Sequence, residues 1–433
     1  MAQSGDWVTP YLWGKPWFEK PALLYWMTAL GFDAGLSRDL APRLPLALLS
    51  LAFLAFYWRR LKHAWGSRAA GYATAMLATS AGWLTFSHVA VTDVPLAVFF
   101  SAAWLLSLEW MECGERRLLP AAAACLAAAT LAKGLVPLVL FLPVAIIPAF
   151  SGGWRRLSDW LRPAPLLAFA VCALPWYVLV TLRNGREFLR VFFVEQHFSR
   201  FSSTALQHVQ PWWFYVPVLL VLLFPWFPLL AWPSIAGRED LKRDVRVKVL
   251  VGVFLFGFLF FSASVNKLFG YLLPLAPVLF TLIGVRLKAL NSPAKVVIAP
   301  LALIAVLPVA AEVAPRVMSA HGLRGMDITG GSGGALAVWM VAGGIAGALL
   351  ARMLPRPAFS IAAATVGAAF LWFQFAAFPR LDQFGSARPM SASGALGCAP
   401  ALPRDLLYGL YYYSGKEIPN CAVLDPTGNR VVR

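Results

Sequence analysis

The sequence predicts an all-α polytopic membrane protein, and three observations support this prediction. Of the 433 residues, 60% are hydrophobic and only 13% are charged, whereas soluble domains are about 45–50% apolar and about 25% charged. Apolar stretches close to the length that crosses a bilayer recur along the whole chain. The loops between these stretches alternate between strongly and weakly basic, which is typical of membrane proteins.

About twelve membrane-spanning helices are expected from the apolar stretches. They are predicted at residues 42–58, 69–87, 94–111, 119–132, 135–150, 164–182, 212–232, 248–264, 271–285, 296–312, 335–351 and 357–376. The short fourth and fifth stretches are separated only by Lys133-Gly134, so these two could instead form a single broken hairpin.

The loop charges predict an orientation. One set of loops is short and basic: "WRRLKHAWGSR", "ECGERR", "GGWRRLSDWLR", "GREDLKRDVRVK", "RLKALNSPAK" and "ARMLPRP". The alternate loops are mostly longer, more aromatic and less basic, and they include 1–41 and 183–211. Basic loops stay in the cytoplasm, so the second set, together with 377–433, is predicted to lie outside. Residue 1 is then outside, which requires either an unusual N-out insertion or a further helix upstream, and we expect the upstream helix.

The C-terminal segment differs from the transmembrane domain expected over 1–376. Within 377–433, "LYGLYYYSGKEIP" and "CAVLDPTGNRVV" are typical of short strands joined by turns. We therefore predict a small external α/β domain here. Cys398 and Cys421 could form a disulfide in it if it lies outside the cytoplasm.

The net charge of +17 does not indicate a nucleic-acid partner, because the basic residues are explained by topology and no nucleic-acid-binding motif accompanies them. The sequence also lacks a Ser-His-Asp order, a phosphate-binding glycine loop and an H-E-x-x-H zinc motif. Function must therefore be sought in the charged groups at the membrane surface.

Two motifs in the first external regions carry carboxylates. Asp93, in "TDVPLAVFF", could present its carboxylate at an external active-site mouth, or it could simply cap the helix that begins there. In "FEKPALLYW", Lys20 is suited to a phosphate headgroup, and Glu19 to a metal or a substrate group. The alternative is an interfacial ion pair next to an aromatic belt.

Two further motifs carry cations. His197 and Arg200, in "VFFVEQHFSRF", share a face if this loop is helical and suit a phosphate, although a lone histidine often has no such role. Lys267 and Tyr271 form K-x-x-x-Y in "VNKLFGYLLP", and the alternative for Lys267 is an ordinary interfacial lysine.

Taken together, "SGDWVTPYLWGKPWFEKPALLYW", "TDVPLAVFF", "EQHFSRF" and "FFSASVNKLFGYLLPLAP" resemble the aminoarabinose transferase and protein O-mannosyltransferase superfamily. These are GT-C glycosyltransferases that use polyprenyl-phosphate sugars. The resemblance covers nearly the whole chain in order and implies a fold of about thirteen helices, about twelve of them present here. It implies sugar transfer on the periplasmic face of a bacterial cytoplasmic membrane to a lipid A-like lipid, a glycan or a protein.

The resemblance also implies roles for individual residues. It implies catalytic roles for Asp93 and Glu19, donor-phosphate binding by Lys20, Arg200, Lys267 and Tyr271, and a possible divalent metal at Glu19 and His197. A carboxylate would take the acceptor proton, and the cations would stabilise the charge that grows on the departing lipid phosphate.

One departure from the family pattern matters. The family's principal catalytic carboxylate, an Asp usually followed by Glu, should lie shortly before "SGDW", where only Met1-Ala2-Gln3 stand, and Asp6 matches a different position. We therefore expect an upstream start; otherwise the chain as given is an inactive membrane scaffold. A transporter or lipid flippase is a further alternative, but it needs charges in mid-helix, and the predicted spans are nearly free of them.

Overall fold

The computed structural model describes residues 1–199, 209–231, 244–289, 293–311, 332–392, 404–415, 418, 423–424 and 430–431. The chain forms two compact units. The N-terminal unit comprises Met1–Pro300 and Gly347–Ala364, and the C-terminal unit comprises Leu301–Ala346 and Thr365–Arg433.

Seven helices among the described residues are long and apolar enough to cross a membrane. They are α2 (Leu44–Trp65), α5 (Asp93–Cys113), α10 (Pro163–Leu189) continued by η2 (Arg190–Ser199), α14 (Val245–Ala263), η5 and α15 (Phe269–Leu275 and Ala276–Lys288), η6 and α16 (Pro293–Val297 and Ile298–Ile304) and α19 (Ala358–Gly385). Shorter apolar helices are α6 (Leu118–Lys133), α7 and α8 (Val136–Leu140 and Leu142–Gly152), η3 and α12 (Trp212–Phe214 and Tyr215–Leu222) and α18 (Ser332–Met353). The all-α membrane fold is confirmed, and the count of about twelve spans stays a prediction.

The predicted spans 69–87 and 212–232 are not single helices. The stretch 69–87 divides into α3 (Ser67–Ala78) and α4 (Ala81–Ser87). Hydroxyls cause the break: Thr79 Oγ1 donates to the Ala75 carbonyl at 2.6 Å and Ser80 Oγ to that of Leu77 at 2.9 Å, which competes with continued helix. The stretch 212–232 likewise ends its regular helix at Leu222 and continues as the short η4 (Phe227–Leu230) in a proline-rich segment.

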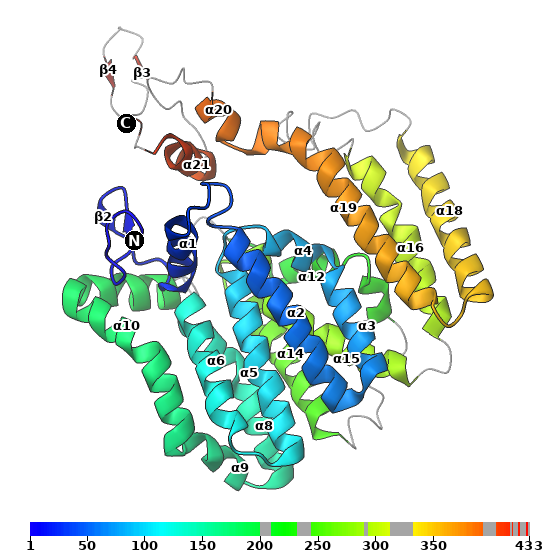
Figure 1. Cartoon of the computed structure of the whole chain (residues 1–433), viewed down its shortest axis with the longest axis horizontal. Helices are drawn as coiled ribbons and strands as arrows, with labels where there is room; N and C mark the ends of the chain where they lie inside the picture. The colour runs from blue at the N-terminus through cyan, green and yellow to red at the C-terminus, as the bar shows by residue number, and fades with distance from the viewer. Residues whose placement is uncertain are drawn as a thin grey trace. The chain divides into compact units, whose positions relative to one another are not determined.

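Helix α5 is the centre of the N-terminal unit (Figure 1). Apolar residues fill almost its whole circumference, and most of its side chains are buried, as expected of a helix surrounded by other helices. It packs against α6, α2 and η5, while α10 covers the other side of α6, and α3 packs against α15.

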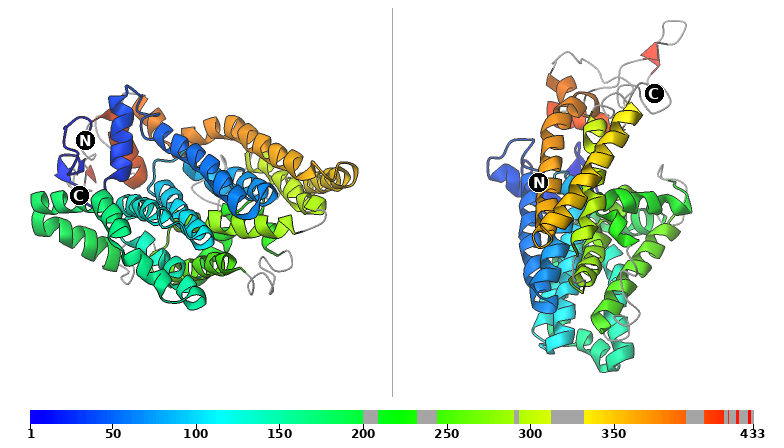
Figure 2. Two further views of the ribbon diagram at one scale, coloured as in Figure 1. Left: turned by 60° about the horizontal axis from the view of Figure 1, so that its bottom comes forward. Right: turned by 90° about the vertical axis from the view of Figure 1, so that its right-hand side faces the viewer.

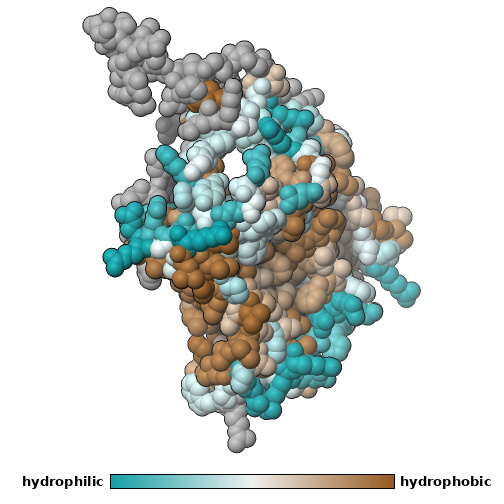
Figure 3. Space-filling model, turned by 60° about the vertical axis from the view of Figure 1, so that its left-hand side comes forward, coloured by the Kyte–Doolittle hydropathy of each residue, from teal (hydrophilic) through white to brown (hydrophobic). Residues whose placement is uncertain are grey.

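The outer surface of α10 faces away from this core. Its exposed side chains are apolar over several turns and include Leu166, Leu167, Val171, Leu174, Val178 and Leu182. Figure 3 shows a broad hydrophobic zone on this side of the molecule, with hydrophilic side chains gathered above and below it. Such a zone fits the hydrocarbon layer of a bilayer.

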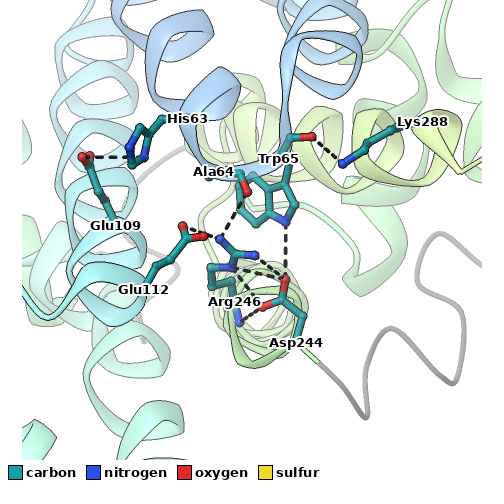
Figure 4. Close-up of polar contacts among 8 residues, drawn as sticks. All are labelled: His63, Ala64, Trp65, Glu109, Glu112, Asp244, Arg246 and Lys288. Carbon is teal, nitrogen blue, oxygen red and sulfur yellow. Dashed lines mark hydrogen bonds and ion pairs between the residues drawn. The ribbon is translucent and has the colours of Figure 1, made fainter.

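The described loops lie at the two ends of the N-terminal unit, and they are divided between these ends as their charges predicted. His63, Glu112, Asp244 and Lys288, from four different basic loops or their flanks, meet at one end, as Figure 4 shows. Asp93 and Lys133 meet at the other. We call these the inner end and the outer end, after the predicted orientation; which of them faces the periplasm stays a prediction.

In the C-terminal unit, α16, α18 and α19 lie side by side (Figures 1 and 2). Helices α16 and α18 approach closely, since a Cβ at Gly343 would lie 2.6 Å from the Leu301 carbonyl oxygen. Helix α19 continues to Gly385, followed by α20 (Arg388–Ala392) and α21 (Arg404–Ser414).

The last part of the chain was predicted partly correctly. The segment "CAVLDPTGNRVV" does contain strands, since β3 (Val423–Leu424) pairs antiparallel with β4 (Arg430–Val431). The strand predicted in "LYGLYYYS" is wrong: this segment is helix α21. Its apolar residues recur at helical spacing, so that Leu410 and Tyr411 are buried, and Gly415 ends it at φ 75°. Cys398 and Cys421 lie outside the described residues.

Helices α3 and α15 pack closely at Gly284. A Cβ at Gly284 would lie 2.7 Å from the Ala69 carbonyl oxygen, whereas one at Gly71, also in a helix, would meet nothing within 4 Å. Gly284→Ala should therefore destabilise the protein by about 1–3 kcal/mol through overpacking, and Gly71→Ala should stabilise it by about 0.5–1 kcal/mol. Thermal unfolding in detergent measures both, and equal midpoints for the two variants would contradict the packing.

Candidate active site

The N-terminal segment is fixed to the outer end of α10. Asp6 accepts hydrogen bonds from the backbone N–H groups of Val8 at 2.9 Å and Thr9 at 3.1 Å, and from the Arg183 guanidinium at 2.7 Å. Partial burial opposes ionisation of this carboxyl, but these donors outweigh it and lower the pKa of Asp6. The Trp176 indole donates to the Val8 carbonyl at 2.9 Å. Asp6 therefore has an anchoring role.

The short hairpin of β1 (Tyr11–Leu12) and β2 (Lys15–Pro16) leads into the Glu19-Lys20 motif. Phe18 and Ala22, which flank the motif, are buried in one cluster with Leu131 of α6 and with aromatic side chains of α10. The ring of Phe18 meets that of Phe188 edge-on, with centroids 5.4 Å apart. This apolar packing holds the half-buried charged pair at the outer ends of α6 and α10.

Glu19 and Lys20 themselves lie close to polar neighbours. The ammonium of Lys20 donates to the Glu19 carbonyl at 3.1 Å. Burial, and then the Glu19 carboxylate, raise the pKa of Tyr25 in α1 (Leu23–Asp33). The motif thus places one cation and one carboxylate at the surface where α6 ends.

Asp93 meets a partner that the sequence analysis missed. It is the first residue of α5, and its carboxylate forms a hydrogen-bonded ion pair with Lys133, the last residue of α6. Both side chains are largely buried, at 13% and 10% exposure. The helix dipoles favour this arrangement, because a carboxylate lies at one N-terminus and an ammonium at one C-terminus. Asp93 is therefore more than a helix cap.

Two residues of η5 (Phe269–Leu275), Tyr271 and Gly270, lie against this ion pair. The Lys133 ammonium lies 4.3 Å from the centroid of the Tyr271 ring, a cation–π geometry. A Cβ at Gly270 would lie only 2.7 Å from the Asp93 carboxyl carbon, so glycine allows η5 to approach α5. We call Asp93, Lys133 and Tyr271 the outer cluster.

Lys133 had a sequence signal that was interpreted as a turn. It interrupts a long apolar region between 119–132 and 135–150, and a lone lysine at membrane depth is a functional candidate by default. Its partner could not be found from sequence, because Asp93 lies 40 positions away.

Lys267 is buried, with only 4% of its surface exposed. Its ammonium donates to the backbone carbonyls of Gln210, at 3.1 Å, and Ser264, and desolvation lowers its pKa. Val209 also pairs with Asn266 in an isolated β-bridge. Lys267 therefore fixes the end of the long external loop beside η5, while its contact with a donor phosphate stays a prediction.

The remaining predicted residues are only partly described. His197 lies on η2, which has π-helical geometry, but its side chain and the whole of Arg200 lie outside the described residues. Among the side chains that the structure describes, no group of three or more His, Cys, Asp and Glu residues could hold a metal ion. The metal at Glu19 and His197 stays a prediction.

The Asp6 anchor predicts a pH dependence. Because folding lowers the pKa of Asp6, its stabilising contribution is present above the unfolded pKa of about 3.9 and is lost as the pH falls through the folded value. Pepsin cleavage within the first twenty residues is measured between about pH 5 and about pH 2. At about pH 5 the wild type should be cleaved more slowly than Asp6→Asn, and at about pH 2 the two rates should be equal. A rate ratio that does not change with pH would contradict this anchor.

Comparison with known proteins gives a consistent picture. A family model for dolichyl-phosphate-mannose-protein mannosyltransferases matches residues 19–180. An undecaprenyl phosphate-alpha-4-amino-4-deoxy-L-arabinose arabinosyl transferase of Pseudomonas aeruginosa is 33% identical over 298 residues, which cover 66% of this chain and 52% of that protein. The transferase of the same name from Photorhabdus laumondii is 28% identical over 63% of this chain and 50% of its own length. The chain thus spans about half the length of the curated relatives it matches.

A solved structure is similar over a larger share of its chain. The crystal structure of ArnT from Cupriavidus metallidurans bound to undecaprenyl phosphate matches with a TM-score of 0.75 and 25% sequence identity. The match covers 96% of this chain and 78% of that one.

Proposed function

We propose that this chain, which belongs to the GT-C glycosyltransferase superfamily of aminoarabinose transferases and protein mannosyltransferases, transfers a sugar from a polyprenyl-phosphate donor. The transfer takes place at the periplasmic face of the bacterial cytoplasmic membrane. One observation carries the proposal: the Glu19-Lys20 motif and the outer cluster both lie at the outer end of α6.

The donor is an amphiphile, and the outer end of this unit offers both environments that it needs. The polyprenyl tail remains in the lipid along the apolar surface, and the phosphate lies at the level of Lys20 and Lys133. A phosphate that leaves with growing negative charge is stabilised by fixed cations in a site of low dielectric. Support comes from the similar ArnT structure, which was solved with undecaprenyl phosphate bound.

The two carboxylates take different roles in this proposal. Asp93 is already bound to Lys133, so it holds that ammonium in place between the carboxylate and the ring of Tyr271. Glu19 takes the proton from the acceptor hydroxyl as general base. The transition state at the sugar resembles an oxocarbenium ion, as in glycoside hydrolysis.

The donor sugar is proposed to be an aminoarabinose, because curated relatives at 28–33% identity are by name arabinosyl transferases for undecaprenyl phosphate-linked 4-amino-4-deoxy-L-arabinose. The acceptor is proposed to be a lipid A-like glycolipid, as the sequence resemblance implies. A glycan or protein acceptor is the second candidate, favoured by the mannosyltransferase family model. A transporter is disfavoured, because it needs charged residues in mid-helix and the predicted spans are nearly free of them.

The test compares three lysines of the outer end. Lys20→Ala and Lys133→Met should lower the rate of sugar transfer by about 10²-fold or more, the effect of losing one fixed charge in a preorganised site. Lys15→Ala, an exposed lysine of the same N-terminal segment, should leave the rate unchanged. Transfer is measured by mass spectrometry of lipid A after incubation of the purified chain in nanodiscs with undecaprenyl phosphate-linked aminoarabinose.

The proposal fails if the folded wild-type chain transfers no sugar to lipid A, to a glycan or to a protein. It also fails if Lys20→Ala and Lys133→Met both retain the wild-type rate while Lys15→Ala behaves as expected. Product on a protein and not on lipid A would replace the first acceptor with the second.

A further inference from the structure

A second group of charges lies at the inner end of the N-terminal unit (Figure 4), at the opposite end of α5 from Asp93. Its members come from the C-terminal end of α2, the last turn of α5, the start of α14 and the end of α15. We call the group around Arg246 the inner network; it consists of Arg246, Asp244, Glu112, Trp65 and Lys288.

Arg246 is the hub of this network. Its guanidinium donates to both carboxylate oxygens of Asp244, at 3.0 and 2.9 Å, to Glu112 at 2.5 Å and to the Ala64 carbonyl at 3.3 Å. It also lies over the ring of Trp65, with 4.8 Å between Cζ and the centroid. Only 16% of the side chain is exposed. A planar, bidentate arginine so enclosed defines one relative position of its partners.

Trp65 extends the network to a fourth helix. Its indole N–H donates to Asp244 at 3.4 Å, and its carbonyl accepts from the Lys288 ammonium at 2.7 Å. The network therefore joins α2 and α5, from the first part of the chain, to α14 and α15, from a part more than a hundred residues later.

Two of the three outer-cluster residues, Asp93 and Tyr271, lie at the opposite end of this group of helices. Helix α5 begins at Asp93, α14 ends just before Lys267, and α15 continues η5, which holds Gly270 and Tyr271. These 21 residues of α5 span about 30 Å. By that geometry a tilt of about 2° displaces one end by about 1 Å, and a displacement of about 1 Å in an active site can cost about 10²-fold in rate.

The outer end has little tolerance for such a tilt. The approach of Gly270 to Asp93 leaves no room for a methyl group, and Lys133 contacts both Asp93 and Tyr271. We propose that Arg246 is a positioning residue for sugar transfer: by joining α2 and α5 to α14 at the inner end, it fixes the distance between Asp93 and Tyr271 at the outer end. This inference rests on the proposed function.

The chain offers a matched control. Arg60 forms an ion pair with Glu109 at 2.6 Å, with side-chain exposures of 30% and 16%, at the same inner end. This pair joins α2 only to α5, so it does not bridge the two parts of the site. Arg60→Met removes one half-buried arginine contact without releasing α14.

The experiment has two measurements. Spin labels on Ala90→Cys, just before α5, and Val209→Cys, beside Asn266, report the spacing of the two sides of the outer end in nanodiscs, with the native cysteines replaced by serine. Both positions are exposed. Steady-state kinetics with undecaprenyl phosphate-linked aminoarabinose give kcat and KM separately. Arg246→Met is the test variant, and Arg246→Lys, which keeps the charge but loses the bidentate contact, replaces it if Arg246→Met does not fold.

We expect the Arg246 variant to broaden the label distance distribution and to lower kcat about tenfold or more, with the KM for the donor within twofold of wild type. Arg60→Met should change neither. An Arg246 variant that keeps both the narrow distribution and the wild-type kcat overturns the inference, as does an equal effect of Arg60→Met. If the wild type transfers no sugar, the proposed function fails, and the label distances still decide whether Arg246 fixes the outer end.

Discussion

The ion pair between Asp93 and Lys133 is the interaction on which the outer end of this protein depends. Each charge alone would be costly at the end of an apolar helix, and a buried pair compensates only when its geometry is good and its other bonds are satisfied. Here the first residue of α5 meets the last residue of α6, and the Tyr271 ring covers the ammonium. The pair therefore fixes both where the two helices meet and where η5 must pack.

An apolar cluster lies beside this polar centre, at the outer end of α6. Phe18, Leu131 and Phe188 pack together, so that apolar contacts hold the Glu19-Lys20 motif at the outer end of α6. Lys267 fixes the opposite side by binding carbonyl groups of two loops. The charged residues are thus the groups proposed to act in the reaction, while aromatic residues and backbone carbonyls hold them in place.

The fold was largely predictable because apolar length and loop charge are local properties of the sequence. The breaks within the predicted spans were less predictable, because the break at Thr79-Ser80 depends on two hydroxyls that bind carbonyls of the preceding turn. Helix α21 was missed because it contains tyrosines, which favour a strand. At the site, Asp93 was identified from its position, but its pairing with Lys133 depends on the meeting of two helices, which periodicity does not encode. The contact between Gly270 and Asp93, far apart in sequence, is of the same kind.

The order in which the chain is synthesised gives the ion pair a further consequence. Asp93 and Lys133 lie 40 positions apart, so both are available as soon as α5 and α6 form one hairpin, well before η5 is made. They can enter the bilayer surface as a neutral pair, which spares the insertion machinery two separate charges. Tyr271, whose ring lies over the ammonium, is synthesised more than a hundred residues later. A nascent chain therefore carries the neutral ion pair without its aromatic contact until η5 and α15 are inserted.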